Sequence, residues 1–355
     1  MPTWWNWQTR TTQNRVPQGM WVRFPPSALS MDLFYDIVII ACVSATVLPA
    51  VILLYHRRKH PESWEYKNKN KSALFAATLL IGTFFLFYGS FVEPNLLTVN
   101  RQIIDLPGLE KPLKIALISD IHVGDFNKES DTQRIADLIL SLNPDLVFVD
   151  GDHTFGNYKD DNRIDYLKPL GQVAKKIPTY AVHGNHEYGV GLYDSDIKKR
   201  FKLPNKSAEI AQAMRNLGVR YLINETEKIT VNGESFLLFG GDEFLIDAVN
   251  YESLDKAKLE NPELPIIALI HNPTAIYEAS KHGIDLVLSG HTHGGQVRLP
   301  FIGPAGTIET DLPHAWYQGL VEYNGSKLFV TSGANESGAR LRLFNPPEIV
   351  LLTIQ

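Results

Sequence analysis

Five short groups of acidic, amide and imidazole side chains follow one another along residues 120–293 of the sequence. Carboxylate, amide and imidazole groups are ligands of borderline divalent cations such as Mn²⁺, Fe²⁺ and Zn²⁺. Residues two apart in an extended backbone share a face, so Asp120 and His122 can bind one ion together. One such group alone is weak evidence, because an isolated histidine after a strand is more often structural. Five groups in succession predict a metal site with the candidate ligands Asp120, His122, Asp152, Asn185, His271, His291 and His293.

Most of these groups come directly after a short apolar run, and such runs are predicted β-strands. Continuous Val, Ile and Leu runs are typical of strands that are covered on both faces. The predicted strands are Lys114–Ser119, Leu146–Val149, Thr179–Val182, Phe236–Gly240, Ile266–Ile270, Leu286–Ser289, Lys327–Thr331 and Ile349–Ile354. Helical spacing of apolar residues predicts the helices Asp131–Leu142, Ala208–Leu217 and Thr274–Lys281. The turn at Asn232-Gly233 predicts a hairpin of Tyr221–Val231 and Phe236–Gly240.

The alternation of strands and helices predicts an α/β domain with layered sheets and helices outside them. In open α/β sheets, functional sites gather beyond the carboxyl ends of the strands, where these polar groups lie. Gly151 permits a sharp turn that presents the carboxylate of Asp152. The glycines around His291 and His293 let the backbone bend, so that both imidazoles can face the same cavity.

Two uncharged apolar runs, Ile37 to Tyr55 and Ala73 to Val92, precede this domain. A helix rises 1.5 Å per residue, so each run spans roughly 30 Å, about the thickness of the hydrocarbon core of a bilayer. Buried core helices usually have a polar face, and neither run has one. We therefore expect a transmembrane hairpin within residues 31–96, followed by the catalytic domain at residues 97–355.

The connection between the two runs is short and basic. Positively charged short loops stay in the cytoplasm, so the turn of the hairpin is expected there. The catalytic domain would then lie on the non-cytoplasmic side of the cell membrane, which is the inner membrane in a Gram-negative source. The basic residues of this connection are Arg57, Arg58, Lys59, Lys67, Lys69 and Lys71.

Residues 1–30 differ from the rest of the chain. They are rich in Trp, Gln, Thr and Arg, and they lack the apolar core of a signal peptide. Val22-Arg23-Phe24-Pro25 matches an in-frame translation of GTTCGATTCC, a sequence that resembles the T-arm of a transfer RNA gene. Our hypothesis is that this segment is an over-extended gene prediction and that translation starts at Met31. The alternative is a genuine disordered or interfacial tail.

The composition sets broad limits on function. The chain has 355 residues, is 44% hydrophobic and carries a formal charge of −5, so it has no global basic footprint. Nucleic acid is therefore not favoured as a partner, although a local basic groove stays possible. Cys42 is the only cysteine, which excludes both an intrachain disulfide and a zinc site built on several thiolates.

The order of the five groups, D-x-H, G-D, G-N-H-E, H and G-H-x-H, resembles that of the calcineurin-like metallophosphoesterase superfamily. Two stretches are similar to its bacterial membrane-associated branch, namely Gly290-His291-Thr292-His293-Gly294-Gly295-Gln296 and Phe344-Asn345-Pro346-Pro347-Glu348-Ile349. The resemblance covers residues 113–355. It implies a four-layer αββα sandwich with a dinuclear metal centre between the ends of two sheets.

The resemblance also implies a role for each residue. One cation would be held by Asp120, His122, Asp152 and His293. The other would be held by Asp152, Asn185, His271 and His291, with Asp152 bridging the two. His186 would stand beside the cations as the proton donor or transition-state contact. Two cations about 3.5–4 Å apart can hold a bridging hydroxide as the nucleophile and clamp the phosphoryl oxygens.

One position departs from the family pattern. Phe155 stands three residues after the bridging Asp152, where the family commonly has an acidic or amide residue that orients the catalytic histidine. The support of His186 is therefore open. Either another carboxylate supplies it, with Asp150 as the nearest candidate, or His186 contributes less to the rate.

Several other polar residues have a less specific pattern. His153 could touch substrate, and either arginine before the last strand could reach a phosphate, although structural roles fit these positions equally well or better. Glu187 is expected to orient local backbone rather than act as a base. Surface positions are expected for His282 and His314, which have no partner pattern in the sequence. The two arginines are Arg340 and Arg342.

Three functions are compatible with these patterns. The first is hydrolysis of a phosphoester or pyrophosphate near the membrane, on a phosphorylated small molecule or a lipid-linked substrate. The second is a nuclease with the same metal centre, and the third is a non-catalytic membrane module that keeps metals only for folding. A nuclease needs a basic groove, yet acidic residues match the basic ones beside the site. The residues of this flank are Lys159, Asp160, Asp161, Arg163, Asp165 and Lys168.

Overall fold

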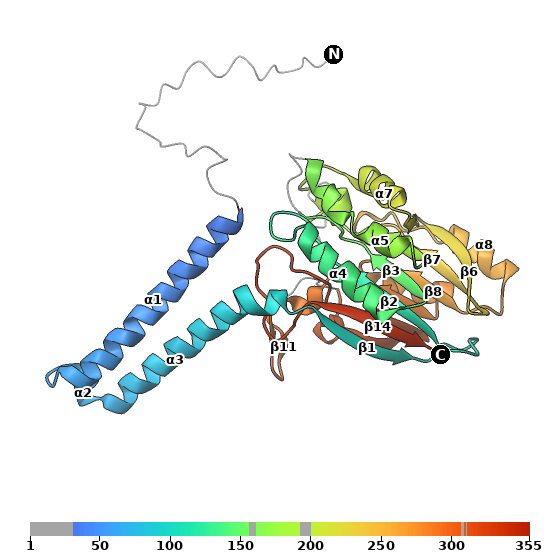
Figure 1. Ribbon diagram of the computed structural model, residues 1–355. Helices are drawn as coiled ribbons and strands as arrows, with labels where there is room; N and C mark the ends of the chain where they lie inside the picture. The colour runs from blue at the N-terminus through green and yellow to red at the C-terminus, as the bar shows by residue number, and fades with distance from the viewer. Residues whose placement is uncertain (1–30, 156–160, 192–199, 307–308, 310) are drawn as a thin grey trace, which may run out of the picture.

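The computed structural model describes residues 31–155, 161–191, 200–306, 309 and 311–355. The proposed over-extension at residues 1–30 lies outside the described residues. Two six-stranded sheets form the centre of the catalytic domain (Figure 1). The first sheet has the order β1 (Thr98–Ile104), β14 (Glu348–Ile354), β2 (Leu113–Ser119), β3 (Leu146–Asp150), β4 (Thr179–Val182), β5 (Arg220–Tyr221). The second has the order β12 (Gly319–Tyr323), β13 (Ser326–Val330), β9 (Leu286–Ser289), β8 (Ile266–Leu269), β7 (Glu234–Gly240), β6 (Glu225–Val231).

Strand direction decides where the site can form. Strands β2, β3, β4 and β5 run parallel, and so do β13, β9, β8 and β7. The carboxyl ends of each parallel set therefore meet at one edge of its sheet. Within the two six-stranded sheets, the antiparallel pairs are β14 with β2, β12 with β13 and β6 with β7.

Alternating side chains build three apolar layers. Along β2, Ile115 and Leu117 face the second sheet, whereas Ala116 and Ile118 face the helices, as the two-residue period of a strand requires. The first sheet is covered by α4 (Glu129–Leu142), α5 (Leu170–Ala174) and α7 (Ser207–Asn216). The second is covered by α8 (Glu252–Glu260) and α9 (Ile276–Ala279). The predicted four-layer αββα sandwich is thereby confirmed.

Three elements differ from the sequence-based predictions. Tyr221–Val231 is not one strand, because the chain turns at Asn224, with a φ of 53°, between β5 in the first sheet and β6 in the second. The predicted helix at Thr274–Lys281 is interrupted, with 3₁₀ turns on both sides of α9. Strands β1 and β12 lie at sheet edges and are half-exposed, so neither has an apolar run to reveal it.

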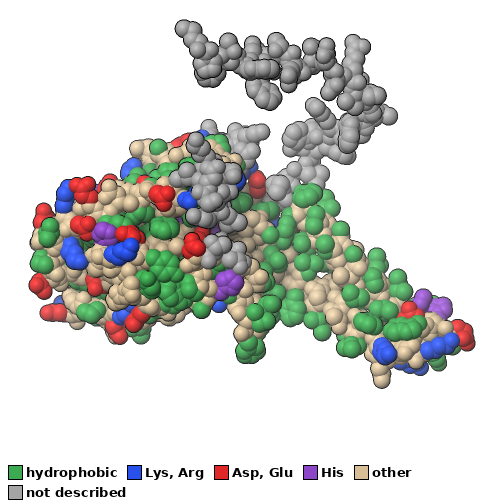
Figure 2. All heavy atoms as spheres, turned by 180° about the vertical axis from the view of Figure 1, so that it is seen from behind, with side chains coloured by type: hydrophobic (Ala, Val, Ile, Leu, Met, Phe, Trp, Pro, Cys, Tyr) green, Lys and Arg blue, Asp and Glu red, His purple; other side chains and the backbone are tan. Residues whose placement is uncertain are grey.

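Two long helices precede the domain, as predicted. They are α1 (Met31–Lys59) and α3 (Lys69–Phe87), joined through the short α2 (Trp64–Lys67). A π-helical turn, Tyr88–Val92, and a 3₁₀ turn, Glu93–Asn95, extend α3 towards β1. By length and composition, Leu33–Lys59 and Lys69–Asn95 could each cross a bilayer. Figure 1 shows the pair projecting from the domain, and Figure 2 shows an apolar shaft with charged and histidine side chains gathered at its far end.

The loop of residues 340–344 fastens this hairpin to the domain. The amide of Arg342 donates to the carbonyl of Gly89 at 2.9 Å, and the amide of Phe344 donates to the carboxylate of Glu93 at 3.0 Å. The guanidinium of Arg340 pairs with Asp36 of α1 at 2.5 Å. Arg340 therefore binds α1, and the alternative that it reaches a phosphate is not supported.

Leu238 in β7 tests the core between the sheets. It is fully buried, so Leu238→Ala should lower the free energy of unfolding by about 2–5 kcal/mol through lost burial and the cavity left behind. Leu320→Ala on the exposed side of β12 is the control and should change it by less than about 0.5 kcal/mol. Denaturant unfolding of the full chain in detergent measures both, and equal effects would contradict this assignment of the core.

Candidate metal centre

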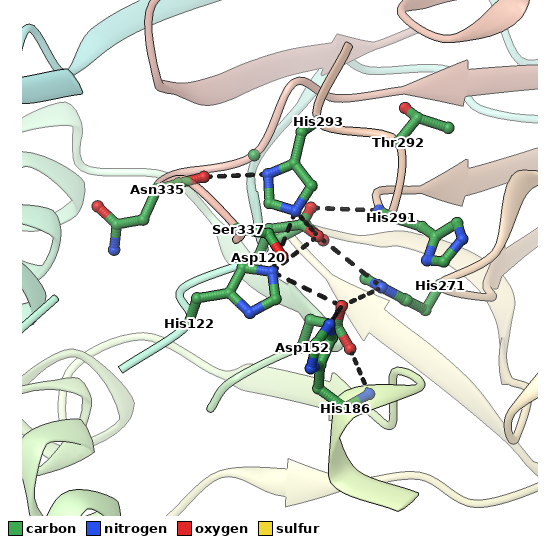
Figure 3. A network of polar contacts seen from close by, with 12 residues as sticks. Asp120, His122, Asp152, His186, His271, His291, Thr292, His293, Asn335 and Ser337 are labelled. Carbon is green, nitrogen blue, oxygen red and sulfur yellow. Dashed lines mark hydrogen bonds and ion pairs between the residues drawn. The ribbon is translucent and has the colours of Figure 1, made fainter. Parts of the chain in front are cut away.

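The predicted ligands all lie at the carboxyl ends of strands, where the two sheets meet (Figure 3). Asp120 and His122 follow β2, Asp152 follows β3, and Asn185 follows β4. From the second sheet, His271 follows β8, whereas His291 and His293 follow β9. All of these side chains are buried. The structure thus brings together all seven predicted ligands.

One group of donor atoms lies around Asp120. The Nε2 atoms of His122 and His293 are 3.0 Å apart, and Oδ1 of Asp120 is 3.3 Å from Nε2 of His293 and 3.7 Å from Nε2 of His122. Two imidazole nitrogens and one carboxylate oxygen therefore point at a common position. This arrangement can hold a cation.

A second group lies around Asp152. Its Oδ2 is 3.1 Å from Nε2 of His271, and Oδ1 of Asn185 is 2.9 Å from Nδ1 of His291. The side-chain amide of Asn185 donates to the carbonyl of Val190 at 2.8 Å, which turns Oδ1 towards the site. The same Oδ2 of Asp152 is 3.7 Å from Nε2 of His122 in the first group. Asp152 therefore occupies the position of a bridging ligand.

The donor atoms fit divalent cations. Oδ1 of Asp120 and Nε2 of His271 are buried and have no hydrogen-bond partner among the described residues. Burying such atoms without a partner costs free energy, and a cation at the common position would offset that cost. Imidazole, carboxylate and amide ligands suit Mn²⁺, Fe²⁺ or Zn²⁺ and do not select among them.

The backbone at the ligands is strained. Asp120, His122, Asp152, His291 and His293 have φ values of 56°, 46°, 48°, 66° and 50°. Side chains other than glycine rarely adopt this left-handed region, and each instance costs of the order of 1–3 kcal/mol. Such strain persists only where the surroundings hold it, so the loops after β2, β3 and β9 must be fixed by other contacts.

Glu187 supplies one of these contacts. Its buried carboxylate accepts the amide protons of Asp152 at 3.0 Å, His153 at 2.9 Å and Gly184 at 2.7 Å. Burial opposes ionisation, but His153 beside the carboxylate keeps the pKa of Glu187 below its ordinary value. Glu187 thus orients backbone, as predicted from the sequence. His153 is buried against it, so the hypothesis that His153 touches substrate is wrong.

The second ring nitrogen is bonded in three of the four imidazoles, whereas Nδ1 of His122 has no hydrogen-bond partner among the described residues. Nδ1 of His271 donates to the carbonyl of Asp150 at 2.7 Å, and Nδ1 of His293 donates to the carbonyl of Asn335 at 3.1 Å. Nε2 of His291 lies 2.8 Å from Oε1 of Glu309. Such partners fix the ring orientation and the tautomer of a metal ligand. Sequence reasoning missed Glu309 and Asn335, because both lie in loops without periodicity and Asn335 acts through its backbone.

His186 stands at the rim of this cluster. Its Nε2 is 3.9 Å from Oδ2 of Asp152, and its backbone amide donates to Oδ1 of Asp152 at 2.9 Å. The ring of Phe155 packs 5.0 Å from the ring of His186 and 5.4 Å from that of His122. An aromatic ring therefore takes the place of the expected carboxylate or amide. Asp150 does not support His186, because its carboxylate lies beside His271 and is bonded to no other described residue.

The remaining candidates have structural positions. Arg342 is fully buried and donates to the carbonyls of Ser332 at 2.7 Å and Asn335 at 2.6 Å, so it does not reach a substrate phosphate. His282 has a partner, because its Nδ1 lies 3.0 Å from Asp255, whereas His314 is exposed.

Burial and charge shift the titration of the cluster. Burial raises the pKa of a carboxyl group, but the neighbouring His271 and His186 reverse this effect and hold the pKa of Asp152 well below its usual value. Burial lowers the pKa of His293 to about 3 and that of His186 to about 4. These shifts keep Asp152 anionic and His293 neutral near pH 7, which are the protonation states that a ligand requires. Burial opposes the charge of His271 and His291, but Asp152 raises the pKa of His271 and Glu309 raises that of His291.

A hollow of about 310 Å³ opens onto the cluster. Its size is at the lower end of the range for small-molecule sites. The lining residues are Asp152, Asn185, His186, Gly191, His291, His293, Gln296 and Ser337.

Comparison with known proteins agrees with the fold. The calcineurin-like phosphoesterase family matches residues 113–295. An "Uncharacterized metallophosphoesterase" of Aquifex aeolicus is 32% identical over 280 residues, which cover 75% of this chain and 95% of that protein. The chain therefore belongs to the calcineurin-like phosphoesterase family.

Two further relatives are matched over different shares of their own length. A "Transmembrane protein with metallophosphoesterase domain" of Danio rerio is 30% identical over 277 residues, which cover 74% of this chain but only 57% of that protein. The phosphodiesterase YaeI of Escherichia coli is 28% identical over 246 residues, which cover 68% of this chain and 82% of that protein.

Glu187→Ala should disturb the candidate metal centre, although Glu187 is not itself a predicted ligand. The change leaves three buried amides without an acceptor, at about 1–3 kcal/mol each, so the thermal midpoint should fall and bound metal should be lost. Glu209→Ala, at a partly exposed glutamate of α7, is the control. Metal analysis together with thermal unfolding provides the test. A Glu187→Ala protein with full metal content and an unchanged midpoint would refute this role.

Proposed function

We propose that this protein is a membrane-anchored hydrolase of phosphoesters or pyrophosphates that uses two divalent cations. The observation that carries the proposal is the position of Asp152, whose Oδ2 lies within 3.7 Å of both His271 and His122. One carboxylate oxygen between two separate donor groups is suited to bridge two ions. A site for a single structural ion has no need of a shared ligand.

The ligands divide between the cations as the donor groups do. One cation would be held by Asp120, His122, Asp152 and His293, and the other by Asp152, Asn185, His271 and His291. When bound, such a pair acts as a Lewis acid on the phosphoryl group and lowers the pKa of water, which provides a nucleophile at neutral pH.

His186 would contact the phosphoryl group. His186 lies next to the ligand cluster, and its side chain lines the hollow that opens onto that cluster. Burial lowers its pKa to about 4, so the imidazole is neutral at pH 7. A neutral imidazole has one ring N–H to donate, which favours the role of a transition-state contact over that of a proton donor. The ring of Phe155 restricts the rotation of His186 without accepting a hydrogen bond.

The hairpin of α1 and α3 would anchor the enzyme in the cell membrane. Only 11% of the apolar window in Leu33–Lys59 and 22% of that in Lys69–Asn95 are buried, so most of the apolar surface lacks a protein partner. Lipid is the solvent that such a surface requires. The basic turn favours the cytoplasm for the tip and the opposite side for the catalytic domain, where a phosphorylated small molecule or a lipid-linked phosphate would be the substrate.

The two alternatives have less support. A nuclease needs free cations beside the site, but Arg163 pairs with Asp125 at 2.6 Å and Lys168 pairs with Asp165 at 2.9 Å. The remaining basic residue of that flank, Lys159, lies outside the described residues. A non-catalytic module has no need of His186 at the mouth of an open hollow.

Variants of two residues separate binding from catalysis. The purified protein should hydrolyse bis(p-nitrophenyl) phosphate, lose activity on chelation and regain it with Mn²⁺. His186→Ala should lower kcat about 10²-fold or more while both cations stay bound, because His186 is not a ligand. Asp152→Asn should lose metal and activity together. Metal loss from the His186→Ala protein would show that His186 helps to hold the cations, which would contradict its assignment as a catalytic residue that is not a ligand.

Membrane topology is tested by cysteine labelling in a Cys42→Ser background. Glu62→Cys places a thiol in the turn of the hairpin, and Lys256→Cys places one on the exposed face of α8. In intact cells or spheroplasts, a membrane-impermeant maleimide should label position 256 and should reach position 62 only after permeabilisation. The reverse pattern would place the catalytic domain in the cytoplasm.

A further inference from the structure

A short β-hairpin carries an unusual apolar tip. Strands β10 (Arg298–Leu299) and β11 (Gly303–Pro304) pair antiparallel, and the turn between them exposes Phe301 fully and Ile302 to 76%. Leu299 beside them is 40% exposed. Isolated exposed apolar residues are common, but contiguous ones at the end of a projection mark a contact site. We call residues Leu299–Ile302 the apolar tip.

The turn between the two strands has an unusual residue at its third position. The amide of Ile302 donates to the carbonyl of Leu299 at 3.1 Å, with Pro300 and Phe301 between them, and Phe301 has a φ of 67°. A turn with proline second and a positive φ third normally takes glycine or asparagine at that third position. The sequence instead places a large aromatic side chain there and leaves it in solvent.

The apolar tip is continuous with the membrane hairpin. Phe344 lines the same hollow as Phe301 and Ile302, and its ring lies 5.5 Å from that of Phe85 in α3. The backbone is tied as well, because Val297 bridges to Leu343. Figure 1 shows β11 beside the domain-proximal end of α3, on the side of the domain from which the two helices project.

The base of the same hairpin belongs to the mouth of the metal centre. Gln296 lines the hollow over the cluster together with His293, and it accepts the amide proton of Ser337 at 2.7 Å. One η-nitrogen of Arg298 donates to the carbonyl of Gly294 at 2.8 Å, which fixes the start of β10 to the loop of the ligands. Only a few residues therefore separate the active-site mouth from the apolar tip.

We infer that the apolar tip inserts into the bilayer that the helical hairpin spans and holds the active-site mouth at the lipid surface. A second copy of the chain is a weaker candidate, because the tip is already continuous with α3 through Phe344 and Phe85. The substrate preference that follows from this insertion rests on the proposed function. A mouth held at the lipid surface favours a phosphoester linked to a lipid over a freely diffusing one.

Site-directed fluorescence tests the insertion without an activity measurement. In the Cys42→Ser background, a bimane label is placed on Phe301→Cys, and the full chain is reconstituted in phosphatidylcholine vesicles with and without brominated acyl chains. Leu259→Cys on α8 is the matched control, since Leu259 is an 83% exposed apolar residue at the far end of the domain. Ile81→Cys, 57% exposed in the middle of α3, reports the membrane anchor itself.

We expect bromolipid quenching at positions 301 and 81 and none at position 259. Aqueous iodide should quench position 259 several-fold more strongly than position 301. Quenching at 81 with free iodide access at 301 would overturn the insertion and leave the anchor intact. Loss of bromolipid quenching at 81 would overturn the anchor. Protection of 301 from both quenchers, with crosslinking between chains through Phe301→Cys, would assign the tip to a second copy.

The preference for lipid-linked phosphoesters is tested by comparing two substrates. Phe301→Ser combined with Ile302→Ser should lower hydrolysis of a phospholipid monoester in these vesicles at least tenfold relative to hydrolysis of bis(p-nitrophenyl) phosphate. An unchanged ratio would overturn the assigned substrate class. Failure of the unmodified protein to hydrolyse either substrate would count against the proposed function and would not affect the fluorescence result.

Discussion

The structure depends on the burial of charged side chains at the edge where the two sheets meet. Two carboxylates and the imidazoles around them are withdrawn from solvent, and for each buried ion this costs several kcal/mol in the absence of a compensating charge. Neighbouring imidazoles offset part of the cost for Asp120 and Asp152. Cations in the two donor groups would offset more. The strained backbone at five ligands shows that the fold maintains this cluster against its own local preference.

Neither sheet makes the centre alone. The short contacts between ligands cross from one sheet to the other, with Asp152 against His271 at 3.1 Å and Asn185 against His291 at 2.9 Å. The apolar layer between the sheets fixes their relative position and hence these distances. Any ligand that binds only the folded cluster must therefore also stabilise the packing of the sheets, because binding and folding are linked. The packing of the core and the geometry of the candidate metal centre therefore depend on each other.

The sequence predicts what periodicity and strand order determine. Buried strands such as β3 and β8 have continuous apolar runs, and the ligands are recognisable because each follows such a run. The positions of Glu309 and Asn335 depend instead on irregular loops, and Asn335 contributes a carbonyl that every residue type has. The edge strands β1 and β12 are half-exposed and therefore have no continuous apolar run to reveal them. The chain passes from β5 in the first sheet to β6 in the second by a turn at Asn224, where the backbone φ is positive.

The membrane hairpin and the metal centre share one loop, and this has a mechanical consequence. The carbonyl of Asn335 receives the Nδ1 proton of His293, while Arg340 and Arg342 of the same loop bind Asp36 and Gly89 of the two helices. The guanidinium of Arg342 also donates to Asn335, which closes the connection within the protein interior. A displacement of the helices would have to break these bonds or move His293. The two N-terminal helices are therefore bonded to the same loop that positions His293.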